Sequence, residues 1–291
     1  MELQWLPNTN LSSLHTAWCL SHFPQAATAC EDALRESAAG LDALPGSFSV
    51  PRDRFWEQLL ALAPSVDFSG DLAQRLMVRL GLRAESQRSR LAAAVQDCRR
   101  HFEHSFPRYQ AEARLRTGPM QQMWQAQGPG LLRILGRLSE PELLVEQAQV
   151  VVVQPILGGM GFAHLSTNRV HIEGLLTHAD PQLPETLRLA WLLGQLDLER
   201  PVYSELIHAS RLRCLAGLAL LPAVLQAGQE LDLCLVSPAS MAQAIALWRV
   251  DTLQHPPLAA AHIVHSWWET YQHSRPQWRI ALTGLDRLLL A

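Results

Sequence analysis

Residues 149–176 differ in pattern from the rest of the chain, and they read QVVVVQPIL (149–157), GGMGFAHLST (158–167) and NRVHIEGLL (168–176). The first and last of these segments are short and rich in β-branched residues, as strands are. The glycine-rich segment between them is typical of a turn. We therefore predict a β-hairpin, or two neighbouring strands, in the middle of the chain.

On both sides of these strands, apolar residues recur at helical spacing. Several helical segments begin at a proline, such as Pro51, Pro184, Pro238 and Pro276, where a missing amide donor costs nothing. The predicted helices span residues 51–63, 69–82, 85–115, 184–197, 200–227, 238–249, 257–274 and 276–290. The sequence thus predicts an α+β protein that is mainly α-helical, with a small β-hairpin or small sheet in the middle of the chain.

The segment 184–197 is apolar around almost its whole circumference, and only Arg188 and Gln195 share a polar stripe. A helix of this kind is surrounded by protein on nearly every side, so we predict that it is the core helix of its domain. A buried Arg188 needs a carboxylate partner, for which Glu173 and Glu205 are the candidates.

The balance of basic and acidic residues changes near residue 118. Residues 72–118 hold ten Arg and four acidic residues, while the remaining residues hold 14 Arg and 23 acidic residues. The stretch TGPMQQMWQAQGPG (117–130) follows and has the Gly and Pro content of a boundary. We predict an N-terminal helical region with Arg-rich helices over 1–118, and a C-terminal α+β region over 119–291 that holds the hairpin 149–176 and the core helix.

Composition predicts a folded, soluble, cytoplasmic protein. Apolar residues make up 48% of the 291 residues and charged residues 18%, which suits a packed interior. The N-terminus has no basic segment typical of a signal peptide, and no uninterrupted apolar run approaches the length that spans a bilayer. The five cysteines are scattered without a C-x-x-C pair, as expected for reduced thiols.

The chain contains 24 arginines and no lysine. A phosphate-binding P-loop needs its lysine, and Schiff-base enzymes need an amine nucleophile. The absence of lysine therefore excludes both classes of chemistry.

The order of elements over residues 149–227 resembles the core of the zincin metallopeptidases, in which an edge strand precedes a helix carrying H-E-x-x-H. If LRLAWLL (187–193) is placed over that motif, Leu187 and Trp191 stand at the histidine positions and Arg188 at the glutamate position. Leucine and tryptophan cannot ligate zinc, and a guanidinium is no general base at neutral pH. The resemblance implies a degenerate, inactive relative of that family.

A second candidate site lies in AAAHIVHSWWETYQHSR (259–275). Its members His262, His265, Glu269 and His273 fall on one face of the predicted helix. Imidazole and carboxylate groups at such spacing can chelate zinc or another divalent metal. The opposite face holds large apolar residues and must point inward, so the stripe faces solvent or a partner.

The arginine-rich segment offers a binding surface instead. The arginines that could contact nucleic-acid phosphates are Arg75, Arg79, Arg83, Arg99 and Arg100. Aromatic residues at 102, 106 and 109 could stack on unpaired bases. The whole chain has a net charge of −3, so an intramolecular or subunit contact is the favoured role of these arginines.

From these observations we predict a non-catalytic interaction or scaffold protein without a cofactor, which binds a protein partner or a second copy of itself. The first alternative is a metal-dependent hydrolase that uses the cluster near 262–273, with further ligands from His164, His171 or His178. The second alternative is a nucleic-acid-binding module formed by residues 72–118.

Overall fold

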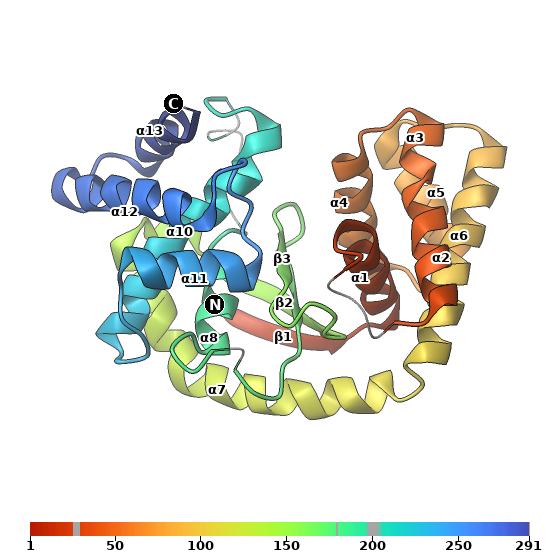
Figure 1. Ribbon diagram of the computed structural model, residues 1–291, viewed down its shortest axis with the longest axis horizontal. Coiled ribbons are helices and arrows are strands. Elements are labelled where there is room, and N and C mark those ends of the chain that lie inside the picture. The colour runs from red at the N-terminus through yellow and green to blue at the C-terminus, as the bar shows by residue number, and fades with distance from the viewer. Residues whose placement is uncertain (26–29, 179, 197–202, 204, 291) are drawn as a thin grey trace. The chain divides into compact units, whose positions relative to one another are not determined.

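A computed structural model describes residues 1–25, 30–178, 180–196, 203 and 205–290. Within these residues the chain is mainly α-helical and contains one four-stranded sheet (Figure 1). The predicted fold class, α+β and mainly α, is confirmed. Two compact units divide the chain: the helical unit, Leu6–Arg116 with Val151–Leu157, and the sheet unit, Met1–Trp5, Thr117–Val150 and Gly158–Ala291.

The helical unit packs its helices around α1. Its helices are α1 (Thr9–His22), α2 (Asp32–Asp42), α3 (Leu44–Phe48), α4 (Arg52–Leu62), α5 (Ser69–Leu80) and α6 (Glu85–Ser105). Helix α1 contacts α2, α4 and α6, and α5 contacts α4 and α6. The core between them is filled by large side chains such as Leu14, Leu34, Phe55, Trp56 and Phe102, all at most 1% exposed.

The long helix predicted over 85–115 is interrupted. Helix α6 ends at Ser105 and α7 (Tyr109–Leu138) begins after it. The break lies at Phe106, whose backbone is not helical (φ −127°, ψ 62°). Pro107 follows, and a proline disfavours the helical conformation in the residue before it.

Helix α7 runs through the stretch 117–130 that we predicted as a boundary. Pro119 and Pro129 both lie inside this helix. The division between the two units falls between Arg116 and Thr117, in the course of α7. This stretch is helical, so its glycine and proline residues do not break the secondary structure.

The sheet has the strand order β1-β2-β4-β3. Its strands are β1 (Glu2–Pro7), β2 (Gln147–Val153), β3 (Gly161–His164) and β4 (Arg169–Glu173). The two predicted strands, now β2 and β4, are neighbours. The hairpin is instead the antiparallel pair β3 and β4, because the glycine-rich connection between β2 and β4 contains β3.

Helix α8 (Glu185–Leu193) contacts β3, β4 and α10 (Ala209–Glu230). A Cβ atom on Gly161 of β3 would lie 2.7 Å from Leu192 Cδ1 of α8, so glycine permits this close approach. The predicted core helix 184–197 is found as α8, but it ends at Leu193: residues 194–196 form a turn, and residue 197 lies outside the described residues. Helix α10 begins nine residues later than predicted, residues 205–208 are not helical, and residues 200–202 and 204 lie outside the described part.

Three further helices complete the sheet unit: α11 (Pro238–Trp248), α12 (Pro257–Ser274) and α13 (Trp278–Leu290). Helix α12 contacts α10, α11 and α13, and Trp267 of α12 donates a hydrogen bond of 2.9 Å to the carbonyl of Ala281 in α13. Helix α12 has the predicted bounds. Its contacts place one of its faces against α10, where the candidate site lies.

One helical segment, Ser210–Glu230 of α10, is long and apolar enough to cross a membrane by length and composition. In the structure, 83% of its most apolar window is buried inside the protein. This segment packs as a core helix, in contact with α8, α12 and α13.

Candidate binding pocket between helices α10 and α12

Helix α12 has an inward apolar face and an outward polar face. Ala261, Val264, Trp267, Trp268 and Tyr271 are buried in the core. The aromatic members of this face also contact one another and Trp278 of α13. This packing fixes the rotation of α12 about its axis, and so determines which polar residues border α10.

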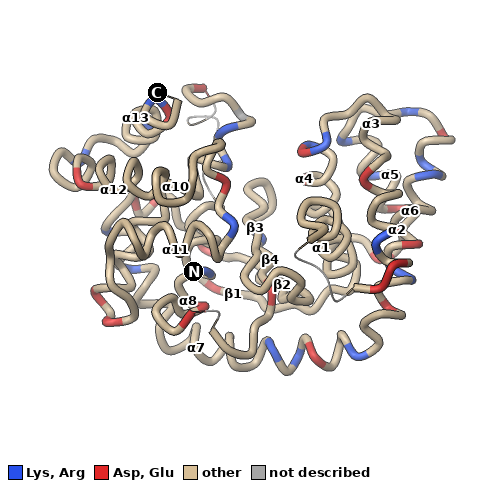
Figure 2. The backbone as a smooth tube through the Cα atoms, viewed as in Figure 1, with Lys and Arg blue, Asp and Glu red and all other residues tan. Residues whose placement is uncertain are grey.

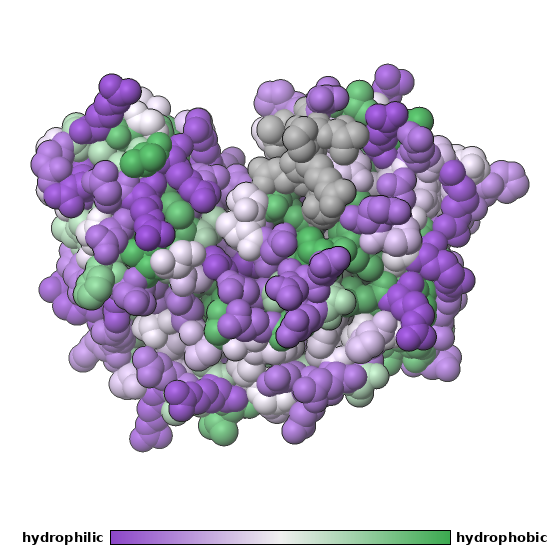
Figure 3. Space-filling view, turned by 180° about the vertical axis from the view of Figure 1, so that it is seen from behind, coloured by the Kyte–Doolittle hydropathy of each residue, from purple (hydrophilic) through white to green (hydrophobic). Residues whose placement is uncertain are grey.

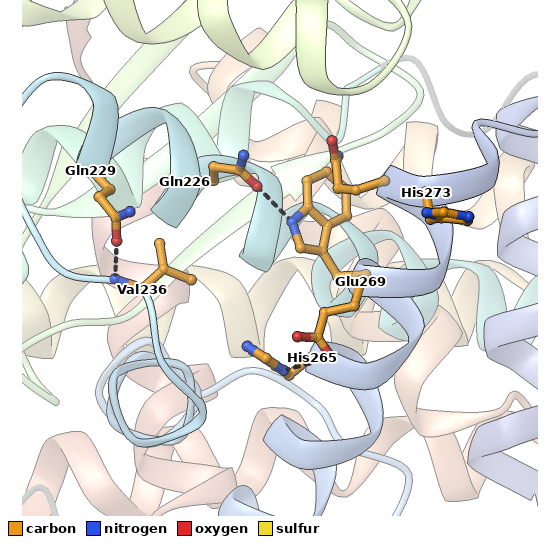
Figure 4. A pocket seen from close by; sticks show the side chains of 8 residues that line it. Gln226, Gln229, Val236, His265, Glu269 and His273 are labelled. Carbon is orange, nitrogen blue, oxygen red and sulfur yellow. Dashed lines mark hydrogen bonds and ion pairs between the residues drawn. The ribbon is translucent and has the colours of Figure 1, made fainter.

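A pocket of about 500 Å³ lies between α10 and α12 (Figure 4). Two glutamines of α10 and one residue of the loop that follows it form one side, and α12 forms the other. The lining residues are Gln226, Gln229, Val236, His265, Trp268, Glu269, Gln272 and His273.

Each of the three glutamines uses its carbonyl oxygen for an internal hydrogen bond. Gln226 Oε1 accepts from the indole of Trp268 at 2.8 Å, and Gln229 Oε1 accepts from the Val236 amide at 2.8 Å (Figure 4). Gln272 Oε1 accepts from the guanidinium of Arg275. Indole, backbone amide and guanidinium groups are donors only, so the orientation of all three glutamine amides is fixed.

The NH₂ groups of the same glutamines are unused. Gln272 Nε2 is buried and has no hydrogen-bond partner. Such an unsatisfied buried donor costs about 1–3 kcal/mol. The described residues provide no partner for the NH₂ groups of Gln226 and Gln229 either. The pocket therefore presents two neutral donors, those of Gln226 and Gln229, because Gln272 Nε2 is closed to solvent.

Three of the four residues of the predicted metal cluster line this pocket: His265, Glu269 and His273. The fourth, His262, is exposed and does not line it. The Nδ1 of His265 lies 3.6 Å from Glu269 Oε2, and the Glu269 side chain is 68% exposed. Among the described residues, no three ligand atoms of α12 lie within 4.8 Å of one another. A metal ion here would need side-chain movement or a ligand from a second element.

The residues at the zincin-like positions are packed inside the protein. Leu187, Arg188 and Trp191 are at most 5% exposed. Leu187 lies against Gly228 of α10, where a Cβ would be 2.7 Å from Leu187 Cδ2. The indole of Trp191 donates to the carbonyl of Gly217 at 2.7 Å and its ring contacts that of Trp248.

Arg188 has a different carboxylate partner from the two that we predicted. Its guanidinium forms a buried ion pair with Glu185, one turn earlier in α8. It also donates to the carbonyls of Met160 at 3.1 Å and Glu173 at 2.8 Å. The carboxylate of Glu173 instead accepts from the amides of Gly159 and Met160 at 2.8 and 3.0 Å. The prediction of Glu173 or Glu205 as the ion-pair partner is wrong, because the i, i+3 neighbour on the same helix is closer.

The strand in the zincin-like pattern is an interior strand. Residues 149–153 belong to β2, which lies between β1 and β4, and the edges of the sheet are β1 and β3. The strand 149–157 thus does not offer the exposed edge that the pattern requires.

The three further histidines considered as metal ligands do not line the α12 pocket. His164 and His171 share a hydrogen bond of 2.8 Å between Nε2 and Nδ1. Burial, together with the charges of Arg213 and Arg169, lowers the pKa of His164 to about 3. His178 Nδ1 accepts from the amide of Glu185 at 3.2 Å, next to the start of α8.

The arginines of the predicted nucleic-acid surface fall into two groups. On α6, Arg99 pairs with Glu103 and Arg100 with Asp97, both at 2.9 Å. On and after α5, Arg75, Arg79 and Arg83 have no carboxylate partner among the described residues, although Arg79 donates to Gln58 Oε1 at 2.9 Å. Figure 2 shows acidic residues interspersed with the basic ones along α5 and α6.

We expect no salt-dependent affinity of the purified protein for single-stranded DNA or RNA, because acids accompany these arginines and the net charge is −3. Fluorescence anisotropy with labelled oligonucleotides, over a range of salt concentrations, measures this. Binding that weakens with salt, and that the R75Q/R79Q/R83Q variant loses, would instead establish the nucleic-acid alternative.

Comparisons with models of known protein families, with curated proteins and with solved structures give no match for this chain. Its function is therefore argued from the site itself. Sequence reasoning missed the three glutamines of the pocket, although Gln226 and Gln229 stand three residues apart on one helix face.

Proposed function

We propose that this protein is a non-catalytic interaction protein, and that residues 149–227 form a degenerate zincin-like core in which β3, and not the segment 149–157, lies at the edge of the sheet. The observation that carries the proposal is the burial of α8. Every residue from Glu185 to Leu193 is buried. A catalytic helix must expose its ligands and its base to a substrate, whereas this helix places leucine, arginine and tryptophan at those positions inside the protein.

The polar groups around α8 also have structural partners. Arg188 is occupied by Glu185 and two carbonyls, and Glu173 by two backbone amides. Paired in this way, the two side chains tie α8 and β4 to the backbone around Met160, which is a structural role. The α12 pocket, with neutral amide donors, is suited to binding.

Elemental analysis and a hydrolysis assay test this proposal. We expect protein purified without a histidine tag to hold no stoichiometric zinc and to leave unstructured protein substrates intact. A stoichiometric metal, together with hydrolysis that a chelator abolishes, would overturn it.

One observation favours a second function, that of a metal-dependent hydrolase. His265, Glu269 and His273 line one pocket, with His265 Nδ1 3.6 Å from Glu269 Oε2. If this alternative holds, H265A and E269A lose both the metal and the activity. The matched control is H262A, because His262 lies on the same helix outside the pocket and should retain both.

A further inference from the structure

The α12 pocket has the hydrogen-bonding character of a site for main-chain carbonyls. Its two accessible NH₂ groups belong to Gln226 and Gln229, which stand three residues apart on α10. They are uncharged, and their orientation is fixed by the bonds of their own carbonyl oxygens. The ligand that complements them carries several uncharged acceptors.

The charge of the pocket wall further restricts the class of ligand that can bind. Glu269 is the acidic residue of the pocket wall, and 68% of its side chain is exposed. It repels an anionic ligand and attracts a basic group. The lining contains no arginine among the residues that the structure describes, which also disfavours a phosphate or carboxylate ligand.

Apolar side chains stand beside these polar groups. Val236 belongs to the wall, and the preceding residue, Leu235, is 79% exposed, more than any other large apolar residue among those described. On the face drawn in Figure 3, hydrophobic side chains lie in small areas among hydrophilic ones. The ring of Trp268 is 4% exposed, so it offers no open face on which a sugar could stack.

We propose that the α12 pocket binds an extended segment of a partner protein, whose main-chain carbonyls accept from Gln226 and Gln229 of α10 and whose arginine or lysine side chain pairs with Glu269 of α12. An extended segment offers carbonyls at regular intervals and alternates its side chains, which fits donors on one side and a carboxylate on another. The inference rests on the proposed interaction function and names the partner's chemistry.

Glutamine-to-glutamate substitutions test the donors directly. In Q226E and Q229E a carboxylate oxygen still accepts from Trp268 or Val236, while the NH₂ donor is replaced by an acceptor. The added negative charge favours a basic partner, so weaker binding by these variants can come only from the lost donor and its repulsion of a carbonyl. The matched control is Q277E, because Gln277 accepts from Arg279 in the same manner but lies outside the pocket.

The probe is an array of short synthetic peptides of random sequence, incubated with the labelled full chain. The peptides that bind best are then measured by fluorescence anisotropy. We expect them to contain arginine or lysine, to bind Q226E and Q229E about tenfold more weakly, and to bind Q277E as they bind the wild type. E269Q should lose the preference for basic peptides. Unchanged circular dichroism spectra establish that each variant is folded.

Several outcomes overturn the inference. They are the absence of any bound peptide, equal binding by Q229E and the wild type, and displacement of the peptide by simple sugars or carboxylates. Peptide binding that is unchanged in Q226E and Q229E would leave the interaction function standing and place the partner elsewhere on the chain. Metal-dependent hydrolysis, tested separately above, would contradict the proposed function itself.

Discussion

R188M is expected to lower the free energy of unfolding by about 3–5 kcal/mol. Arg188 is 1% exposed and Glu185 3% exposed, so the substitution leaves a buried carboxylate without its cation. The carbonyls of Met160 and Glu173 lose their donors as well. Urea denaturation followed by circular dichroism measures the change.

The control is R287M in α13, because Arg287 is exposed and has no ion pair among the described residues. We expect that variant to change stability by no more than about 0.5 kcal/mol. The double variant E185Q/R188M should regain part of the loss, since it removes the charge that R188M leaves unpaired. If R188M proves as stable as R287M, the interactions of Arg188 do not stabilise the core.

The helices that the sequence reveals most clearly are those with one apolar face. Helix α12 was predicted with its correct bounds because Pro257 marks its start and its large apolar residues share one side. Helix α1 was missed because Ser12, Ser13, His15 and Thr16 are buried along with its leucines, so polarity does not separate its faces. Periodicity cannot identify a helix that buries its polar residues.

The core helix illustrates which features of a site can be predicted from a single sequence and which cannot. The apolar circumference of 184–197 correctly predicts burial, because few arrangements other than a core accommodate it. The partner of Arg188 was missed because we looked for a carboxylate on another element, while Glu185 stands one turn away. The glutamine amides of the pocket depend on contacts such as that of Gln226 with Trp268, 42 residues apart in the chain. A contact between residues so far apart in the chain cannot be inferred from a single sequence.

We expect the protein to become less stable as the pH falls from about 7 towards 4, because His164 is buried in its neutral form. Burial lowers the pKa of His164 from 6.5 in the unfolded chain to about 3 in the folded one. Between these two values the unfolded state binds a proton that the folded state does not bind. The contribution of neutral His164 to the free energy of unfolding is therefore complete above the pKa of the unfolded chain. It is lost as the pH falls towards the pKa of the folded protein, and the free energy of unfolding then decreases by at most about 1.4 kcal/mol per pH unit.

Urea denaturation at several pH values between about 7 and 5 measures this slope above the range in which most carboxylates titrate. H164Q removes the titrating ring and keeps a polar partner for His171, so its stability should depend less steeply on pH than that of the wild type. H262Q is the matched control, since the same change at an exposed histidine of α12 should leave the slope unaltered. Equal slopes for the wild type and H164Q would mean that His164 takes up a proton in the folded protein, and that the pair with His171 lies in a more polar setting than its burial indicates.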